Sequence, residues 1–476
     1  MDAWLDATAQ AALVRDGQAS PRELVDAAIE RIEALDPQLN AVIHRRFAAA
    51  RAEADGDLPD GPFRGVPIVV KDELAMAGEP LTYGSRVMKD AGASGPYVAD
   101  HDSFVAQKLR AAGFVVLGRT NMPELAVSVT TEPEAYGPTR NPWDVTRSAG
   151  GSSGGSGAAV AAGLVPIAHA SDSGGSIRIP AAHCGLVGLK PTRGRISLGP
   201  KRGESWGSAT VKGCVSRTVR DTAAFLDAIA GPMSGDPNVA PAPARPFVAE
   251  IGAEIGALRV GLLDRPANPD VPGDPDCAAA VHAVGALLSS VGHRVEDAWP
   301  DAMGEADFTK PYATLLAVEM TLELEAMSDM IGRPVADDEL EPLVRIYPPL
   351  GRTVSGPDYL RARRWLEAWS RRLAAWWDEG WDLLAMPVLN GAPPELGWVT
   401  DPVEGFNRLL PLVQYTAQAN MSGQPAISLP VHWSADGLPI GVQLMAAFGR
   451  EDLLLRVAAQ LEQAKPWAHR RPPVSA

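Results

Sequence analysis

The chain has 476 residues, of which 46% are hydrophobic, and a formal net charge of −15. This composition is typical of a folded globular protein and excludes a disordered chain. The negative charge and the lack of a basic tract argue against nucleic acid and anionic membranes as partners. No stretch has the pattern of a membrane span or a secretory signal, so we expect a cytoplasmic protein.

The first third of the chain alternates between helical and strand patterns. A helix is predicted to follow Ser20, because an N-cap serine, Pro21 and Glu23 form a typical helix start. Three further elements are expected: a strand buried on both faces at 65–70 (GVPIVV), a helix at 103–112 and a strand at 114–120. This alternation predicts an α/β fold.

The rest of the chain has weaker patterns. A Pro-, Gly- and Ala-rich segment at about 230–275 predicts an exposed excursion rather than a domain boundary. Residues 311–330 and 357–378 predict helices, whereas ISLPV and IGVQLM near the C-terminus predict strands. Four tryptophans are predicted to be core residues, with a substrate pocket as the alternative for one of them: Trp365, Trp369, Trp376 and Trp377.

The three cysteines are Cys184, Cys214 and Cys277. They are widely separated and have no CxxC spacing, so neither a disulfide framework nor a zinc site is supported. We predict buried free thiols.

The stretch 150–157 (GGSSGGSG) resembles a flexible linker, but it runs directly into the small apolar sequence GAAVAAGLV. Ten helical residues from Gly154 would rise about 15 Å, and a strand over 167–171 would return about 16 Å. The turn after that strand would therefore lie beside the start of the helix, where Ser152 and Ser176 can meet. This geometry favours a site over a linker.

A serine hydroxyl is a poor nucleophile until a base takes its proton, and the oxyanion formed on attack needs aligned donors. The glycine turn 173–176 (SGGS) could supply these donors through consecutive backbone N–H groups. His169 and His183 lie nearest in sequence as possible bases, but a structural, hydrogen-bonded role is favoured for both. A G-x-S-x-G pattern centred on Ser153 is rejected as a nucleophile elbow, because no apolar strand precedes it.

Lys71 is the other candidate base, because it ends the apolar strand at 65–70 and ligands bind at the carboxyl ends of strands in open α/β sheets. Its pKa would have to fall by about three units for it to act near neutral pH, and burial among valines could supply that shift. An ion pair with Asp72 or another acid remains the alternative.

These residues carry a resemblance to the amidase signature family of serine hydrolases. It rests on GGSSGG, SDSGGSIRIPAA and CGLVGLKPT within 150–192. Further segments match in the family order: GVPIVVKD around Lys71, LRAAGFVVLGRTNMPELA at 109–126, GPTRNPWD at 137–144, ANMSGQPAISLPV at 419–431 and GLPIGVQLM at 437–445. The resemblance covers most of the chain and is thinnest from about 235 to 380.

The resemblance implies a serine hydrolase mechanism without metal or cofactor. Ser176 would be the nucleophile, Lys71 the base and Ser152 the bridging serine, preceded in the family by a cis peptide. The backbone N–H groups of Ser173, Gly174, Gly175 and Ser176 would form the oxyanion hole. Asp172 and Arg178 are expected to support this turn by hydrogen bonds, as an ion pair beneath it, or both.

The family fold is α/β, with a large central mixed β-sheet covered by helices on both faces. We expect a single amidase domain over 1–476, a catalytic core at 65–235 and a variable helical region at about 300–380 that shapes the substrate pocket. By general sequence character, including GRTVSGPDYLRAR at 351–363, the chain is most similar to bacterial amidases that resemble 6-aminohexanoate cyclic dimer hydrolase and aryl acylamidases.

The implied activity is hydrolysis of a C–N bond in a small linear, cyclic or aryl amide, with carbamates or esters as further possibilities. Two other functions stay open: the glutaminase subunit of a transamidation complex and a catalytically silent binding protein. Amidotransferase subunits carry glutamine where this chain has Ile179, which argues against the glutaminase role. The expected partner is a small-molecule amide, and homodimers are common in the family.

Overall fold

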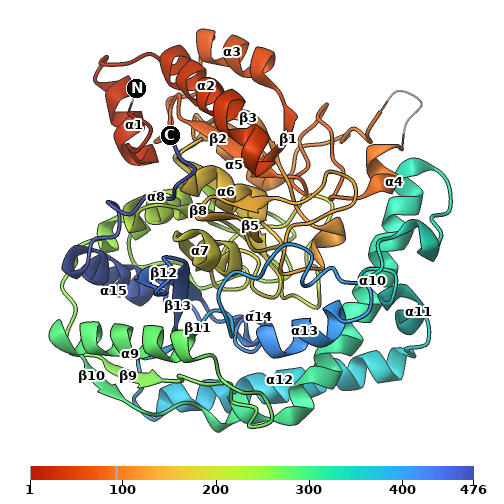
Figure 1. Ribbon diagram of the computed structural model, residues 1–476, viewed down its shortest axis with the longest axis vertical. Helices are drawn as coiled ribbons and strands as arrows, with labels where there is room; N and C mark the ends of the chain where they lie inside the picture. Colours follow the sequence, from red (N-terminus) through yellow and green to blue (C-terminus); the bar gives the residue numbers. More distant parts are fainter. Residues whose placement is uncertain (1, 92–94) are drawn as a thin grey trace.

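The computed structural model describes residues 2–91 and 95–476 (Figure 1). The strands are β1 (Val42–Arg45), β2 (Pro67–Lys71), β3 (Val115–Thr120), β4 (Arg140–Asn141), β5 (Asp144–Ser148), β6 (Ile167–Asp172), β7 (Val187–Lys190), β8 (Val211–Ser216), β9 (Arg259–Leu262), β10 (Arg294–Glu296), β11 (Leu383–Pro387), β12 (Ala426–Trp433) and β13 (Pro439–Met445).

The α-helices are α1 (Ala7–Arg15), α2 (Pro21–Leu39), α3 (Phe47–Asp55), α4 (Arg86–Lys89), α5 (Phe104–Ala111), α6 (Gly154–Ala161), α7 (Arg178–Cys184), α8 (Val219–Ile229), α9 (Pro275–Ser290), α10 (Thr309–Ile331), α11 (Tyr347–Gly351), α12 (Gly356–Asp378), α13 (Gly405–Leu412), α14 (Ala417–Ser422) and α15 (Glu451–Ala464).

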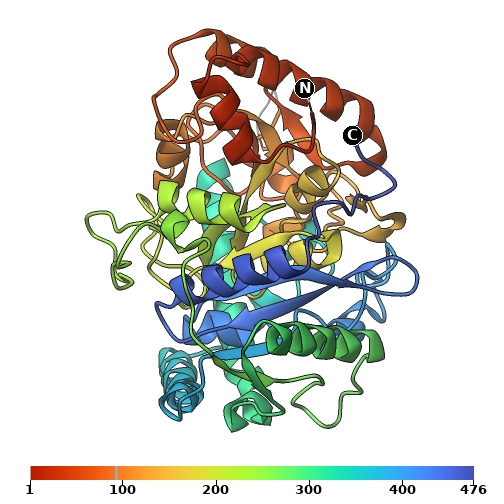
Figure 2. The ribbon, with the colours of Figure 1, turned by 90° about the vertical axis from the view of Figure 1, so that its left-hand side faces the viewer.

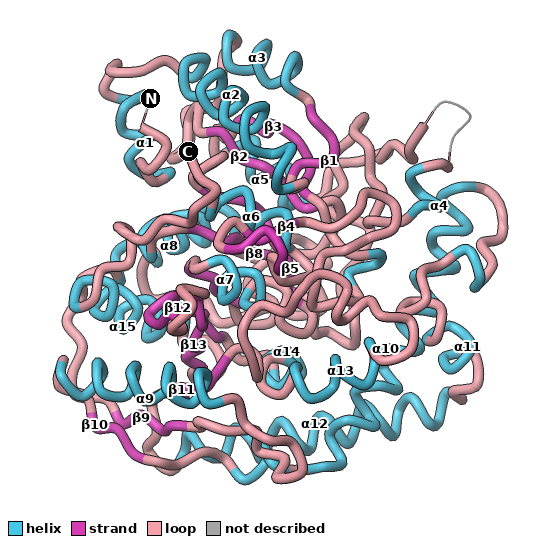
Figure 3. Tube along the Cα trace, viewed as in Figure 1, coloured by secondary structure: helices cyan, strands magenta, loops and turns pink. Residues whose placement is uncertain are grey.

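A mixed sheet of 11 strands forms the centre of the described chain, in the order β1-β3-β2-β6-β8-β7-β12-β13-β11-β9-β10. β2 is parallel to both β3 and β6, whereas the strands from β6 through β8, β7, β12 and β13 to β11 pair antiparallel. Figure 3 shows the strands as a band that runs from β1 at the top to β10 at the bottom. The expected mixed sheet is confirmed.

Helices cover both faces of this sheet. Successive residues of a strand point to opposite faces, so each strand contributes side chains to two hydrophobic cores. On β2, Ile68 and Val70 pack with α5 and α8, whereas Val69 packs with α2 and α6. The first core also includes α9 and α15, which lie across the near side of the sheet in Figure 2. At the far end, α12 and α14 pack on the face opposite α9.

Most elements predicted from sequence are confirmed. The helix after Ser20 is α2, with a complete capping box to Glu23, and the other expected helices and strands correspond to α5, α10, α12, β2, β3, β12 and β13. All three cysteines are free and buried. No helix in the described ranges is long and apolar enough to cross a membrane.

One expectation is wrong in part. The segment 230–275 is not entirely an exposed excursion, because Arg259–Leu262 forms β9 and joins the central sheet between β11 and β10. Val260 and its neighbours are buried there. The short sequence RVGL forms a strand because partners from distant parts of the chain complete its hydrogen bonds.

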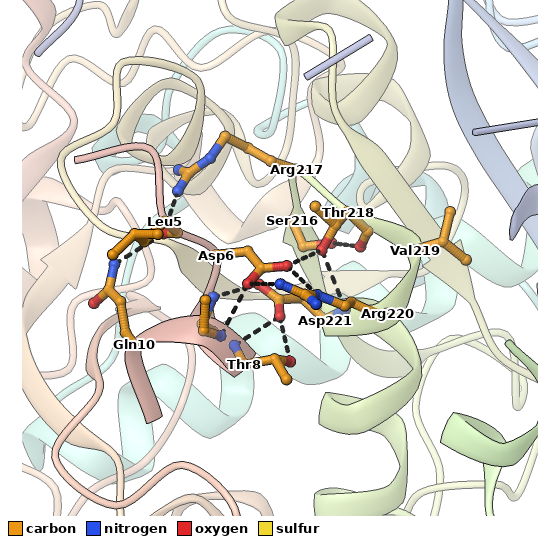
Figure 4. Close-up of polar contacts among 12 residues, drawn as sticks. Leu5, Asp6, Thr8, Gln10, Ser216, Arg217, Thr218, Val219, Arg220 and Asp221 are labelled. Atoms are coloured by element: carbon orange, nitrogen blue, oxygen red, sulfur yellow. Dashed lines mark hydrogen bonds and ion pairs between the residues drawn. The ribbon is translucent and has the colours of Figure 1, made fainter. Parts of the chain in front are cut away.

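The N-terminal segment is fastened to the start of α8 by buried charges (Figure 4). Asp221 accepts hydrogen bonds from the backbone N–H groups of Ala7 and Thr8 at 2.6 and 2.9 Å. Asp6 pairs with Arg220 across the same contact. These bonds hold α1 against α8 on the same side of the sheet.

Helix α6 packs unusually close to the sheet because its residues are Gly, Ala, Ser and Val only. The N–H of Gly155 donates to the carbonyl of Asn121 at 3.2 Å. A Cβ at Gly155 would lie 2.5 Å from the Asn121 nitrogen and 2.7 Å from the Ala41 oxygen, both backbone atoms. This close approach fixes where α6, and the serines before it, lie relative to β3.

Gly155→Ala should therefore destabilise the fold by about 1–3 kcal/mol, because neither backbone segment can move away without breaking other contacts. The measurement is urea unfolding followed by tryptophan fluorescence. Gly356→Ala is the control, since Gly356 starts α12 and a methyl group at this position would have no atom within 4 Å; it should be neutral or stabilising by up to about 1 kcal/mol. Equal stability of the two variants would contradict this account of α6.

Candidate active site

Lys71 lies at the carboxyl end of β2 and is completely buried. Its Nζ donates to Ser152 Oγ at 2.6 Å and to Ser171 Oγ at 2.9 Å. Asp72 does not pair with Lys71: it accepts hydrogen bonds from Thr82 and Gly84 and lies 3.8 Å from Arg119 Nη1. Of the two interpretations of Lys71, the structure supports the one in which its amine contacts serine hydroxyls.

The environment of Lys71 favours the neutral amine. Burial lowers the pKa of Lys71 to about 8, an effect that the nearby carboxylate of Glu73 opposes and the ammonium of Lys212 reinforces. Glu73 pairs with Lys212 at 2.7 Å, so its negative charge is already compensated. A lysine with a pKa near 8 is neutral in a usable fraction of molecules at neutral pH.

The glycine-rich stretch 150–157 is not a linker, because every residue in it is buried. Thr131 holds it in place: its Oγ1 donates to the carbonyl of Gly150 at 2.9 Å and accepts from the N–H of Gly154 at 3.1 Å. The peptide bond between Gly151 and Ser152 is cis, as the family resemblance implies.

The sequence predicted that β6 returns to the start of α6, and the structure confirms this. Ser153, the N-cap residue of α6, accepts from the N–H of Ser171 at 3.4 Å and donates to its carbonyl at 3.3 Å. β6 therefore returns beside the start of α6, and the turn 173–176 follows directly. Ser176 itself is only partly buried, which leaves it accessible to a small molecule.

Asp172 and Arg178 form an ion pair beneath the turn 173–176 and hold it in place. We call this pair and its hydrogen-bond partners the brace. Neither side chain has any exposed surface. Arg178 Nε donates to Asp172 Oδ2 and Nη2 to Oδ1, each at 3.0 Å. The same carboxylate accepts from the N–H groups of Gly175 at 2.7 Å and Ile177 at 3.2 Å. Both expected roles of the pair, ion pair and hydrogen-bonded brace, are present.

Two amide side chains from the C-terminal part of the chain complete the brace. Asn420 donates to Asp172 Oδ1 at 2.8 Å, and both Asn420 and Gln443 accept from Arg178, at 2.7 and 2.8 Å. Burial alone would raise the pKa of Asp172, but Arg178 and Asn420 outweigh it and lower the pKa to about 2. Asp172 is therefore a permanent anion that holds the turn.

The backbone N–H groups of the turn are not equivalent. Gly175 donates its N–H to Asp172, so that group is already occupied. Within the described residues, the N–H groups of Ser173, Gly174 and Ser176 have no hydrogen-bond acceptor. Three of the four groups predicted to form an oxyanion hole are therefore free to bind a negative oxygen.

The two histidines near the site are buried. We expected their rings to be hydrogen-bonded, and this expectation is wrong. The ring nitrogens of His169 and His183 have no hydrogen-bond partner among the described residues. Burial lowers the pKa of each to about 3, so both rings are neutral. Neither ring donates to or accepts from a serine of the site, which leaves Lys71 as the candidate base.

A cavity of about 150 Å³ adjoins the turn at Ser173. Its wall combines apolar residues with charged ones. The apolar residues include Tyr83, Met122, Leu125, Trp206 and Met330, and the charged residues are Glu73, Lys201, Arg202, Lys212 and Glu323. Met330 belongs to α10, within the region expected to shape the pocket. The four tryptophans of α12 do not line it: Trp369 and Trp376 are buried in a core cluster and Trp365 and Trp377 pack against that cluster.

Several residues of the site were not predicted from sequence. Ser171, Glu73 and Lys212 surround Lys71, and the brace includes Asn420 and Gln443. Ser171 could have been suggested by its place one residue before Asp172. Glu73 follows Lys71 by two residues, and Asn420 and Gln443 lie in two of the segments that carry the family resemblance, so the sequence held a signal for these three. Only the fold brings Lys212 to Glu73.

Comparison with known proteins identifies the family of the chain. A family model described as Amidase matches residues 23–455. The chain belongs to the amidase signature family. It is 47% identical to the 6-aminohexanoate-cyclic-dimer hydrolase of Paenarthrobacter ureafaciens, over 99% of this chain and 97% of the relative.

Solved structures show the same relationship. The structure of 6-aminohexanoate cyclic dimer hydrolase complexed with substrate has a TM-score of 0.95 and 45% identity, and the match covers 100% of both chains. A bacterial aryl acylamidase has a TM-score of 0.87 and 26% identity, over 98% of this chain and 97% of that one. The family and fold predicted from the motifs are confirmed, and the chain is an amidase.

Breaking the brace should destabilise the fold strongly. Arg178→Met removes the guanidinium and leaves Asp172 as a buried, uncompensated charge, which should cost about 3–5 kcal/mol in urea unfolding. Arg361→Met is the matched control, because Arg361 pairs with Asp358 on the exposed surface of α12 and should be dispensable. A loss for Arg178→Met no larger than that of the control would refute a structural role for the ion pair.

Proposed function

We propose that this amidase hydrolyses a small amide of the nylon-oligomer type, cyclic or linear, through an acyl-enzyme on Ser176. The observation that carries the proposal is the buried 2.6 Å contact between Lys71 Nζ and Ser152 Oγ, beside the turn that bears Ser176. It joins a lysine with a lowered pKa to a hydroxyl that can relay protons.

In the first step, neutral Lys71 takes the proton of Ser152 while Ser152 takes the proton of Ser176. Ser176 Oγ then forms a bond to the carbonyl carbon of the substrate. The carbonyl oxygen becomes negative and accepts hydrogen bonds from the free N–H groups of Ser173, Gly174 and Ser176. The Asp172 anion lies behind the turn and holds these donors in place.

In the second step, the proton held by Lys71 returns through Ser152 to the substrate nitrogen, and the C–N bond breaks. This transfer matters because an unprotonated amine is a poor leaving group. Water then gives its proton along the same relay, attacks the acyl carbon and releases the acid with regeneration of Ser176. A cyclic substrate is opened by this sequence into a chain with one amine and one carboxylate end.

The substrate class is supported by the whole-length similarity to 6-aminohexanoate cyclic dimer hydrolase. The apolar part of the cavity beside Ser173 suits a methylene chain. A glutaminase role has less support, because Ile179 lies in an apolar cluster directly after the turn. The chain is proposed to act alone or as a homodimer in the cytoplasm.

Purified wild type should hydrolyse the 6-aminohexanoate cyclic dimer, measured by liquid chromatography of the linear product, and Ser176→Ala should be inactive. The panel includes the linear dimer, an anilide, a carbamate and glutamine, so that the acyl pocket is defined by comparison. Ser290→Ala is the control, since it removes an exposed serine hydroxyl that donates only to the carbonyl of Leu287 at the end of α9. Turnover by Ser176→Ala, or turnover of glutamine alone, would contradict the proposal.

The activity should depend on pH through Lys71. Because only its neutral form accepts a proton and its pKa is about 8, kcat/KM should rise about tenfold per pH unit below that value and level off above it. Lys71→Met keeps the aliphatic volume and should lose about 10²–10⁴-fold in kcat, whereas the exposed Lys465→Met should keep the wild-type profile. A rate that falls as the pH rises towards 8 would exclude Lys71 as the base.

A further inference from the structure

One peptide unit of the turn is held at both of its ends. Thr416 Oγ1 donates to the carbonyl of Gly174 at 2.5 Å, and the N–H of Gly175 donates to Asp172 Oδ1 at 2.7 Å. These two groups belong to the same planar peptide, so the two hydrogen bonds together fix its orientation about the chain. Neither bond alone would do so.

The orientation of this peptide decides what the turn presents to a substrate. With the Gly174 carbonyl directed at Thr416, the N–H groups on either side, those of Gly174 and Ser176, remain without acceptors among the described residues. A rotation of the peptide would turn the carbonyl oxygen away from Thr416 and release the Gly175 N–H from Asp172. An oxyanion beside a misdirected carbonyl oxygen would be repelled rather than stabilised.

The turn and Thr416 fit closely against each other. Gly175 has φ of +138°, a conformation that favours glycine. A Cβ at this position would lie 2.6 Å from Thr416 Oγ1. Glycine is therefore needed at position 175 for two reasons. It can adopt this backbone conformation, and its lack of a Cβ leaves room for the Thr416 hydroxyl beside the Gly174 carbonyl.

Thr416 lies 242 residues from Gly174 and is almost completely buried at the N-terminus of α14. The same helix carries Asn420, which donates to the Asp172 carboxylate and to the Asp172 carbonyl, at 2.8 and 3.1 Å. α14 thus controls both ends of the peptide, one directly and the other through Asp172. Thr416 does not line the cavity beside Ser173.

We propose that Thr416 is a positioning residue for the oxyanion hole: its hydroxyl, opposite the Asp172 carboxylate, holds the Gly174–Gly175 peptide in the orientation that leaves the hole open. This inference rests on the proposed function, in which Ser176 is the nucleophile. Because Thr416 is almost completely buried and its hydroxyl already donates to Gly174, it acts through the turn, and its loss should affect the transition state rather than substrate binding.

Thr416→Val removes the hydroxyl and keeps the shape, whereas Thr416→Ser keeps the hydroxyl and removes a methyl group. For the cyclic dimer, the valine variant should lose about 10–100-fold in kcat with KM within about twofold of wild type. The serine variant should recover kcat to within about threefold. Ser422→Ala is the matched control. Ser422 belongs to the same helix, but its hydroxyl donates to the carbonyl of Gln418 and not to the turn.

A second measurement does not depend on the natural substrate. In the reaction with a fluorophosphonate, Ser176 Oγ forms a bond to phosphorus, fluoride leaves and the serine proton passes through Ser152 to Lys71. Intact mass spectrometry with peptide mapping gives the rate and the site. We expect Thr416→Val to react about 10–100-fold more slowly than wild type, and Thr416→Ser and Ser422→Ala to react at close to the wild-type rate.

The outcomes separate the two proposals. Wild type that is not modified at Ser176 would overturn the proposed function. Wild type that is modified, with Thr416→Val equally fast, would overturn the positioning role alone, as would a serine variant as slow as the valine variant. Thr416→Ala serves as a second hydroxyl-free variant, and failure of both valine and alanine variants to fold would make Thr416 a purely structural residue and refute the inference.

Discussion

The ion pair between Asp172 and Arg178 is the contact on which the site depends. Both side chains are fully buried, where separated charges are costly unless every donor and acceptor is satisfied. The pair comes close to this condition with four partners from three segments of the chain: Gly175, Ile177, Asn420 and Gln443. A network of this kind specifies one arrangement of the turn between β6 and α7, because any other arrangement leaves a buried charge unpaired.

Two buried lysines show why burial alone does not identify a base. Burial lowers the pKa of Lys71 to about 8 and that of Lys190 to about 7. Lys190 donates to the carbonyl of Pro191 at 2.8 Å, a group that cannot pass on a proton. Lys71 instead contacts two hydroxyls, which both donate and accept. The neighbouring atoms, rather than the pKa, distinguish a candidate proton relay from a structural lysine.

Local features of the fold could be predicted from the sequence because their causes are local. The cap of α2 lies within four residues, β2 is a continuous apolar run, and α6 with β6 are close enough in sequence for their lengths to imply a shared end. The proposed site residues Lys71, Ser152 and Ser176 were predicted from the motifs that carry the family resemblance. Features that depend on distant partners were missed: β9 needs β11 and β10 to form, and nothing next to Thr416 in sequence indicates that it contacts Gly174.

The brace has a consequence for how the protein is made. The turn 173–176 lies in the second fifth of the chain, yet Thr416, Asn420 and Gln443 contact it or its ion pair from the last fifth. During synthesis the ribosome releases the turn long before these three partners have been translated. A nascent chain therefore carries Lys71, Ser152 and Ser176 before the partners that hold the turn exist, so we expect hydrolytic activity only after the C-terminal strands have joined the sheet.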